Sequence, residues 1–350
     1  MYKGYYMNTY QPSFFDEADR LHKLDKLKDP LTELKEYIDF EIFRPKLEEA
    51  FSKQRRSNAG RKPYNVVFMF KILILQRLYN LSDEQVEYQI ADRLSFGRFL
   101  DLPIGQSVPD FTTVWRFREA LVECGIVREL FDRFTEVLES RGLITKEGSI
   151  VDASFVEVPK QRNSRKDNEL LKKGETPEEW KAKPAKLCQK DLDARWTKKN
   201  GVSYYGYKNH VKCDAVHKVI VDYKATDASV HDSQVFADLV GCGDKGGNVF
   251  ADSAYKSAEI DELLADCEVE NYIHEKGYRN NPLSDIQKEI NRLKSAIRCT
   301  VEHIFGHIQN SMGGPELRYI GFNRIEAGIG LGNLAYNMKR YIQILRPAEL

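Results

Sequence analysis

The hydrophobic pattern of the chain changes once, near residues 142–149, and this change constrains the fold more than any other feature. Before it, apolar residues recur at the spacing of amphipathic or buried helices, as in 33–50 and 64–79. After it, short β-branched and aromatic runs alternate with helical segments. The pattern predicts the α/β class, with an all-helical domain (1–145) ahead of a mixed α/β domain (146–350).

Two signatures predict where helices of the first half begin. Ser82-Asp-Glu-Gln85 has the spacing of a capping box, in which the serine and the glutamine satisfy backbone groups of the first turn. Ser107-Val-Pro-Asp110 repeats it, with the proline where a first helical turn tolerates one. In the helix that follows, Thr112, Thr113 and Arg116 share one face.

The second half reads as strands and helices joined by one long basic segment. Residues 160–200 are Lys-rich and weakly periodic, which predicts a long and partly mobile connection. We expect strands at 149–158, 204–214, 218–224, 248–252 and 269–274, and helices at 229–240, 257–266, 283–310 and 323–345.

Charge is balanced overall and uneven locally. The chain holds 53 Lys and Arg and 53 Asp and Glu residues, so no overall basicity indicates nucleic acid. Five basic residues nevertheless lie within 51–63 without one acid, and 160–212 carries 15 basic against 7 acidic residues, a local charge of +8. Each segment fits either a solvated linker or a contact with the phosphate backbone of DNA.

The cysteine pattern and the apolar runs bear on the compartment. Six cysteines are scattered without a C-x-x-C pair, as is typical of proteins from a reducing compartment. The longest apolar stretch, Val66 to Leu75, is too short to span a bilayer, and the N-terminus lacks the apolar region of a signal peptide. We expect a soluble, cytoplasmic protein without membrane contact.

Two motifs match binding sites in letters only. Gly241-Cys-Gly-Asp-Lys-Gly246 has G-x-G-x-x-G spacing, but it follows an expected helix and precedes an expected strand, the reverse of a dinucleotide site. His303 and His307 could share a zinc ion, but Glu302 stands on the wrong side of the pair for a metalloprotease. We predict a turn at the first motif and favour hydrogen-bonded or partner-contacting histidines at the second.

Three acids stand where a carboxylate is costly unless it is paired or ligated. Asp152 interrupts an apolar strand, Asp252 ends an apolar run, and Glu302 lies one helical turn after Arg298. Each alone is explained as well by a cap, a turn or a surface ion pair. As a set they supply hard oxygen ligands, which suit Mg²⁺ or Mn²⁺, and such a cluster can hold two ions for phosphoryl transfer.

Short phrases around these acids are more specific than any single motif. Two of them lie in the helical half, Gly60-Arg-Lys-Pro-Tyr64 and Pro109-Asp-Phe-Thr-Thr-Val-Trp-Arg-Phe-Arg118. The others follow in order as Ile150-Val-Asp-Ala-Ser154, Tyr204-Tyr-Gly-Tyr-Lys208, Ala225-Thr-Asp-Ala-Ser-Val-His-Asp232, Phe250-Ala-Asp-Ser-Ala-Tyr255, Arg298-Cys-Thr-Val-Glu-His303 and Gly330-Leu-Gly-Asn-Leu-Ala-Tyr336. Over roughly residues 50–345 the chain resembles the DDE transposases of bacterial insertion sequences, specifically the insertion-sequence-five family.

This resemblance implies a ribonuclease-H-like catalytic domain behind a helix-turn-helix-like DNA-binding domain. It implies that Asp152, Asp252 and Glu302 are catalytic and hold two Mg²⁺ or Mn²⁺ ions. The implied enzyme is a DNA transposase that binds the terminal inverted repeats of its element, cleaves the DNA and joins the 3′ ends to target DNA. We therefore expect double-stranded DNA as the partner, a homodimer or higher oligomer on DNA, and association with the nucleoid.

The broader superfamily carries a signature in which Arg298 and Glu302 match. Its Tyr and Lys positions are Ser295 and Gln309 here, which bears on contacts with the DNA end rather than on the metal site. An amide such as Gln309 still hydrogen-bonds a phosphate, without the charge. The expected DNA-binding residues are Arg55, Arg56, Arg61, Lys62, Thr112, Thr113, Arg116, Arg118, Lys208, Arg298 and Gln309.

Two other readings remain open at this point. The first is a catalytically silent, sequence-specific DNA-binding protein derived from a transposase, which Ser295 and Gln309 would favour. The second is a metal-dependent nuclease of the same fold that cuts without joining. The complete set of three acids favours the active transposase over the silent protein.

Overall fold

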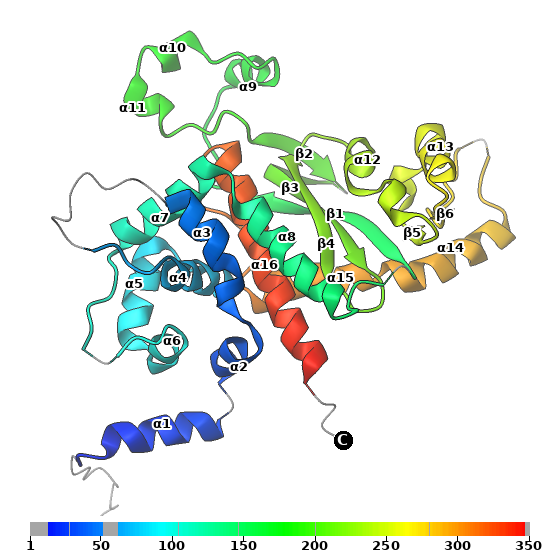
Figure 1. Cartoon of the computed structure of the whole chain (residues 1–350). Coiled ribbons are helices and arrows are strands. Elements are labelled where there is room, and N and C mark those ends of the chain that lie inside the picture. The colour runs from blue at the N-terminus through cyan, green and yellow to red at the C-terminus, as the bar shows by residue number, and fades with distance from the viewer. Residues whose placement is uncertain are drawn as a thin grey trace, which may run out of the picture.

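The computed structural model describes residues 13–27, 29–51, 62–103, 105–145, 147–199, 201–279 and 281–346. The chain is helical up to Ser140 and then forms a mixed sheet with helices on both faces, as Figure 1 shows. The predicted α/β class with a helical N-terminal region is confirmed.

Helices of the first half follow the sequence pattern with two corrections. The expected run 33–50 is broken, because Ile38 is extended and the Asp39 carboxylate caps a new 3-10 turn over Phe40–Phe43. The capping box of Ser82 and Gln85 is confirmed, but the later helix is capped by Asp110, so the predicted start at 107–110 is wrong by one turn. The helices are α1 (Asp16–Lys26), α2 (Pro30–Tyr37), α3 (Arg44–Phe51), α4 (Val66–Leu78), α5 (Asp83–Asp92), α6 (Leu94–Phe99), α7 (Phe111–Cys124) and α8 (Val127–Ser140).

The sheet is antiparallel on one side and parallel on the other. Strands run β1 (Ser149–Glu157), β2 (Arg195–Lys199), β3 (Val202–Asp214), β4 (Ile220–Asp227), β5 (Asn248–Phe250) and β6 (Glu270–Asn271). The order is β2-β3-β1-β5-β6, with β4 also paired to β3. β1 pairs antiparallel with β3 and parallel with β5, so it is the strand at which the direction of pairing changes.

The connection expected at 160–200 is more ordered than its composition suggests. It carries α9 (Arg165–Lys172), α10 (Glu178–Lys181) and α11 (Pro184–Leu187), which form an arm beyond the sheet in Figure 1. Trp180 is buried in this arm, and the ammonium groups of Lys186 and Lys190 lie over its ring. A single tryptophan organises a short basic segment here, which a periodicity argument cannot detect.

The remaining helices flank the sheet. They are α12 (Phe236–Leu239), α13 (Ala258–Asp266), α14 (Asp285–Arg298), α15 (Thr300–Ser311) and α16 (Phe322–Leu345). The single helix expected at 283–310 is divided at Cys299, where the N–H of Glu302 bonds the carbonyl of Cys299 in a tighter, three-residue turn. The Gly241–Gly246 motif forms a turn between α12 and β5, as predicted.

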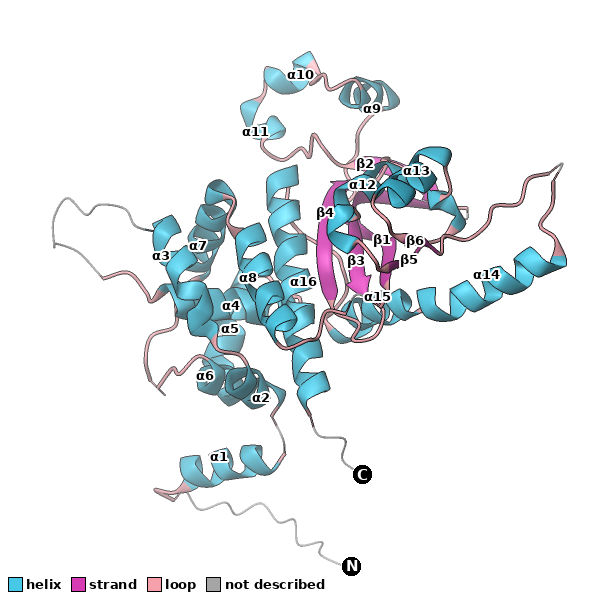
Figure 2. Ribbon diagram, turned by 45° about the vertical axis from the view of Figure 1, so that its right-hand side comes forward, coloured by secondary structure: helices cyan, strands magenta, loops and turns pink. Residues whose placement is uncertain are grey.

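Helix α16 stands between the helical half and the sheet, as Figure 2 shows. One apolar cluster runs through α4, α8, α16 and one face of the sheet, while a second, formed largely by α12, α13 and β5, covers the other face. In β1, Ile150 belongs to the first cluster and Val151 to the second, as alternation along a strand requires. Both halves of the chain therefore contribute to one continuous core.

Two asparagines of α16 fix it to the sheet. The side chain of Asn333 pairs with that of Asn209 on β3, and Asn337 bonds both the N–H and the carbonyl of Ile220. Close approach is possible because the neighbouring position is Gly330, where an added Cβ would lie 2.3 Å from the hydroxyl of Tyr223. The segment from Gly330 to Asn337 is thus a packing motif, and its buried, hydrogen-bonded amides fix its register.

Two further observations complete the fold. Cys242 and Cys267 form a disulfide between the turn after α12 and the end of α13, a pairing that the sequence pattern does not indicate. Within the described ranges, no helix combines the length and apolar composition needed to cross a membrane.

Candidate active site

Strands β1 and β5 bring Asp152 and Asp252 to the same level of the sheet. The strands are parallel with Ile150 opposite Phe250, so the residues two positions further along each chain are next in line. β1 continues through Asp152, whereas β5 ends at Phe250. Asp252 then opens a 3-10 turn, and its carboxylate accepts a hydrogen bond from the N–H of Ala254 at 2.8 Å.

The junction of α14 and α15 places Arg298 and Glu302 over the first of these acids. Nη1 of Arg298 lies 2.7 Å from Oδ2 of Asp152, and Nη2 lies 3.2 Å from Oε1 of Glu302. The Glu302 side chain is 63% exposed and that of Asp152 only 14%. One guanidinium thus links two of the three predicted acids.

The electrostatics of Asp152 are those of a buried carboxyl group. Burial raises its pKa to about 6, and the negative charge of Asp252 adds to this effect. The N–H of Ala153, 2.8 Å from Oδ1, and the positive charge of Arg298 act in the opposite direction. A buried carboxyl group whose pKa is raised beside a second acid is an arrangement expected where a cation binds.

Three polar side chains near this site, Tyr255, Asp232 and His210, were given no role from the sequence. Tyr255 is buried, its hydroxyl has no partner among the described residues, and burial together with the charges of Asp152, Asp232 and Asp252 raises its pKa well above the ordinary value. Asp232 accepts from Nζ of Lys208 at 2.7 Å and lies 4.0 Å from Nδ1 of His210. Burial lowers the pKa of His210 to about 4.

A groove of about 700 Å³ lies along β1 and α15, and its lining begins at Ser154 and Phe305, just beyond Asp152 and Glu302 in the chain. Phe155 forms one wall, and its ring stacks on Tyr204 with 4.1 Å between the centroids. Gln309, two turns beyond Glu302, lines the same groove. Lys160 lines it too, and both side chains are exposed. A groove with a stacked aromatic pair and polar side chains suits a nucleic-acid strand.

The fit of the three acids to a metal ion rests on their donor chemistry. Within the described ranges, no group of three or more His, Cys, Asp or Glu side chains is close enough to hold an ion. The guanidinium of Arg298 instead provides the positive charge between Asp152 and Glu302. Three carboxylates nevertheless offer the hard oxygen ligands that Mg²⁺ or Mn²⁺ prefers.

The predicted reading face lies on α7. Arg116 is exposed, and Thr112 and Thr113 are half-buried on the first turn of the helix. Lys62 is exposed ahead of α4. The other basic residues of that segment, namely Lys53, Arg55, Arg56 and Arg61, lie outside the described residues.

Two predicted DNA contacts are engaged inside the protein. Arg118 is 5% exposed, and its guanidinium holds Asp83 with bonds of 2.5 and 2.9 Å, so it lies apart from the face of Arg116. Nζ of Lys208 lies 2.6 Å from the carbonyl of Val230 and 2.7 Å from Asp232. Neither cation is free to meet a phosphate in this conformation.

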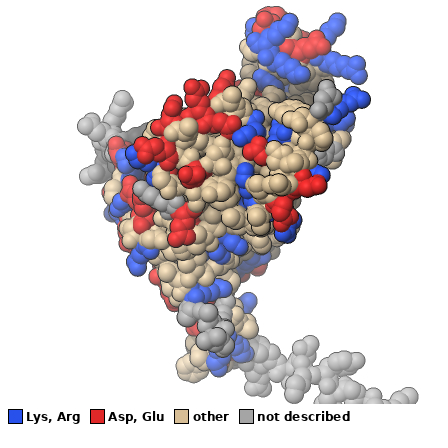
Figure 3. Space-filling model, turned by 90° about the vertical axis from the view of Figure 1, so that its right-hand side faces the viewer, with Lys and Arg blue, Asp and Glu red and all other residues tan. Residues whose placement is uncertain are grey.

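Basic side chains gather on the arm formed by α9–α11, at the top of Figure 3. Its exposed members are Arg162, Arg165, Lys166, Lys172, Lys173, Lys181 and Lys183. Some are neutralised locally, since Lys181 and Lys183 pair with Glu178 and Glu179.

Two families of known proteins match long parts of this chain. Residues 144–338 match the family described as Transposase DDE domain, and residues 19–120 match the one described as Transposase domain (DUF772). A solved structure, the piggyBac transposase synaptic complex with hairpin DNA, superposes with a TM-score of 0.46 at 12% identity, over 90% of this chain and 75% of that one. Because the DDE domain alone spans more than half of the sequence, the chain belongs to the DDE transposase family and is a DNA transposase.

Proposed function

We propose that this transposase cuts the terminal inverted repeats of an insertion sequence of the insertion-sequence-five family and joins the 3′ ends to target DNA. The observation that carries the proposal is the alignment of Asp152 with Asp252 across β1 and β5, with Glu302 held above them through Arg298. Three antiparallel strands (β4, β3, β1) followed by two parallel ones (β5, β6) support a ribonuclease-H-like catalytic domain.

The proposed roles follow from the surroundings of each acid. Asp152, Asp252 and Glu302 would hold two Mg²⁺ or Mn²⁺ ions, which lower the pKa of a bound nucleophile and stabilise the leaving oxygen. Of the two acids that pair with Arg298, Asp152 is more buried than Glu302, so its side chain is held more firmly. Arg298 keeps Asp152 and Glu302 oriented, and its planar guanidinium equally suits a DNA phosphate.

The helical half would bind DNA, and the boundary between it and the catalytic domain would lie near residue 145. Arg116, Thr112 and Thr113 on α7 would read base edges, and the basic residues at 53–62 and on the arm would contact phosphates. Gln309 lines the groove beside the acids, and Arg298 contacts two of the acids directly. Both would bind DNA, and Lys208 would join them once it leaves Asp232. Binding to chromosomal DNA implies association with the nucleoid.

A homodimer on DNA is supported by an unpartnered face of α14. Ile286, Ile290, Leu293 and Ile297 are 75%, 42%, 59% and 41% exposed, and their spacing of four, three and four residues is that of a coiled-coil seam. The opposite face bonds the body of the protein through Asn291, Lys294 and Arg298. Figure 2 shows α14 extending away from the sheet, where a second copy of the helix has access.

The deciding experiment incubates the purified protein with labelled element ends, Mg²⁺ and a target plasmid. Asp152→Asn, Asp252→Asn and Glu302→Gln should each abolish cleavage and joining while DNA binding survives, because shape is kept and one charge is lost. Asp238→Asn, an exposed acid on α12, is the matched control. Cleavage without joining would support a nuclease, and binding without cleavage by the wild type would support the silent protein.

A further inference from the structure

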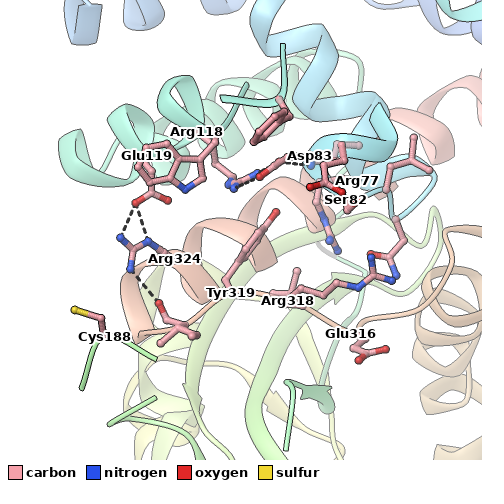
Figure 4. Close-up of a pocket in the computed structure, with 18 residues that line it drawn as sticks. Arg77, Ser82, Asp83, Arg118, Glu119, Cys188, Glu316, Arg318, Tyr319 and Arg324 are labelled. Carbon is pink, nitrogen blue, oxygen red and sulfur yellow. Dashed lines mark hydrogen bonds and ion pairs between the residues drawn. The ribbon is translucent and has the colours of Figure 1, made fainter. Parts of the chain in front are cut away.

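A second cavity lies where the helical half meets the segment that leads into α16. It has a volume of about 480 Å³ and is formed by the end of α4, the start of α5, one side of α7 and residues 316–320 (Figure 4). This cavity and the groove along β1 and α15 share Glu316 and are otherwise lined by different residues. Nothing in the proposed chemistry uses it.

Arg77 of α4 lines this cavity and is only 7% exposed. It makes no ion pair or hydrogen bond with the residues that the structure describes, and its Nε is buried without a partner. Burial lowers the pKa of Arg77, and the nearby charge of Arg118 acts in the same direction. A buried guanidinium without an anion is strongly unfavourable, so this side chain calls for a negatively charged ligand.

The acids of the cavity wall do not supply that anion. Asp83 is held by Arg118, and Glu119 is held by Arg324 at 2.7 Å; the dashed lines of Figure 4 mark these contacts. Arg77 itself lies against the backbone of α16, where a Cβ added at Gly332 would lie 3.3 Å from Nη2. Its guanidinium is therefore fixed in position and faces the cavity, with Arg318 exposed at the rim.

Aromatic side chains stand beside this charge. Phe111 and Trp115 are 46% and 44% exposed on the cavity side of α7, and the ring of Tyr319 lies under the guanidinium of Arg118 at 4.6 Å. Exposed aromatic rings next to a buried cation form the usual surroundings of a nucleotide, whose base stacks while its phosphate is bound. The lining also includes the exposed acids Glu84 and Glu316, so the cavity suits a single phosphate group beside Arg77 better than several at once.

We propose that this cavity binds one phosphodiester of the DNA, with Arg77 as the phosphate ligand and Trp115 as the stacking surface for an adjacent base. DNA rather than a free nucleotide is the source because α7 carries both sets of residues. Arg116 and Thr112 lie on the proposed reading face of this helix, while Trp115 lies on its cavity side. This inference rests on the proposed function, which supplies DNA as the ligand.

The test measures binding of the full chain to a fluorescent duplex that carries the element end, over a series of salt concentrations. Arg77→Met should weaken binding about tenfold and reduce the slope of log affinity against log salt by about one, since one phosphate contact is lost. Trp115→Ala should also weaken binding and leave the slope unchanged. Arg133→Gln, an exposed arginine of α8, should bind as the wild type does.

A second readout separates a missing ligand from a damaged fold. Arg77→Met should unfold at the same temperature as the wild type or higher, because an unpaired buried charge is replaced by an apolar chain of similar length. If circular dichroism shows that Arg77→Met is unfolded, the binding of Trp115→Ala decides instead, and affinity equal to that of the wild type would overturn the proposal. Equal affinity and equal salt slope for the folded Arg77→Met variant would overturn the proposal.

The remaining arms identify the source of the phosphate. Inorganic phosphate and deoxyadenosine monophosphate are added to the free protein, and the midpoint of thermal unfolding is recorded. If they stabilise the wild type while Arg77→Met binds DNA normally, the ligand is a free phosphate compound and the DNA source is wrong. If the wild type fails to bind element ends at all, the proposed function fails instead, which is a separate outcome.

Discussion

Nη1 of Arg298 lies 2.7 Å from Oδ2 of Asp152, although the two residues are 146 positions apart in the chain. This contact joins the end of α14 to the middle of β1 and so ties the helix of Glu302 to the strand of Asp152. The guanidinium balances the charges of the Asp152 and Glu302 carboxylates, which would otherwise repel each other. Replacing Arg298 should therefore change the charge and orientation of these two acids while leaving both in place.

The first prediction concerns Arg298. Replacing it by Ala should raise the pKa of Asp152 further, since the positive charge that opposes burial is gone. Cleavage of element ends should fall, and its acid limb should move to higher pH. The pH–rate profile of Arg298→Ala against that of Arg292→Ala, an exposed arginine on the same helix, measures this. Coincident acid limbs would show that Arg298 does not act on Asp152.

The second prediction concerns stability and pH in the absence of divalent ions. The pKa of Asp152 is about 6 in the folded protein and 3.8 for an ordinary aspartate, so between these values the folded protein keeps a proton that the unfolded chain has released. Stability is therefore lost as pH rises through this window, by roughly 3 kcal/mol relative to Asp152→Asn. Urea unfolding at several pH values in EDTA measures the difference, and parallel curves would contradict it.

The third prediction is the choice of metal. Cleavage and joining should both require Mg²⁺ or Mn²⁺ and both fail in Ca²⁺, whose larger and looser coordination shell misplaces the reacting oxygens. Both should stop in EDTA and return when Mg²⁺ is added back. Full activity in EDTA would remove the metal-dependent mechanism.

The fourth prediction concerns base reading by α7. Arg116→Ala in the full chain should cost about 1–3 kcal/mol of binding at the cognate end and relax the preference at one base pair. Changing Arg55 and Arg56 together, which lie outside the described residues, should weaken binding to DNA of every sequence alike. Competition binding with cognate and random duplexes distinguishes the two effects, with the exposed Arg141→Ala as control.

The fifth prediction concerns the apolar face of α14. Leu293→Lys should leave the thermal stability of the monomer unchanged, because this side chain is 59% exposed, and should prevent the pairing of two copies on DNA. Light scattering of the protein–DNA complex reports the copy number. Lys288→Ala changes an exposed residue elsewhere on the same helix and should leave that number unaltered.

The arrangement of elements follows largely from local patterns. The apolar α4, the capping box at Ser82 and the strand that contains Asp152 all express short-range chemistry, namely periodicity, caps and β-branched runs. Parallel pairing brings Asp152 and Asp252 to one level, an arrangement that the resemblance to DDE transposases implies and that the α/β pattern alone does not.

Other features depend on contacts between distant residues, and no local signal indicates them. The charge of Arg118 looked available for DNA, but Asp83, 35 positions away, holds it. Trp180 organises an arm that has the composition of a loop, because one large buried side chain is enough to order short helices. The unpaired Arg77 lies in an apolar helix and becomes conspicuous only when its neighbours in space are known.

The position of α16 has a consequence for how the molecule is made. Residues 127–140 of α8 leave the ribosome about 180 residues before α16 begins, which at the usual speed of translation is roughly 10–40 s. During that interval the nascent chain exposes the apolar surfaces of α4 and α8 that α16 will cover. A chain that stops before α16 therefore keeps these apolar surfaces open to solvent, and we expect such a fragment to aggregate.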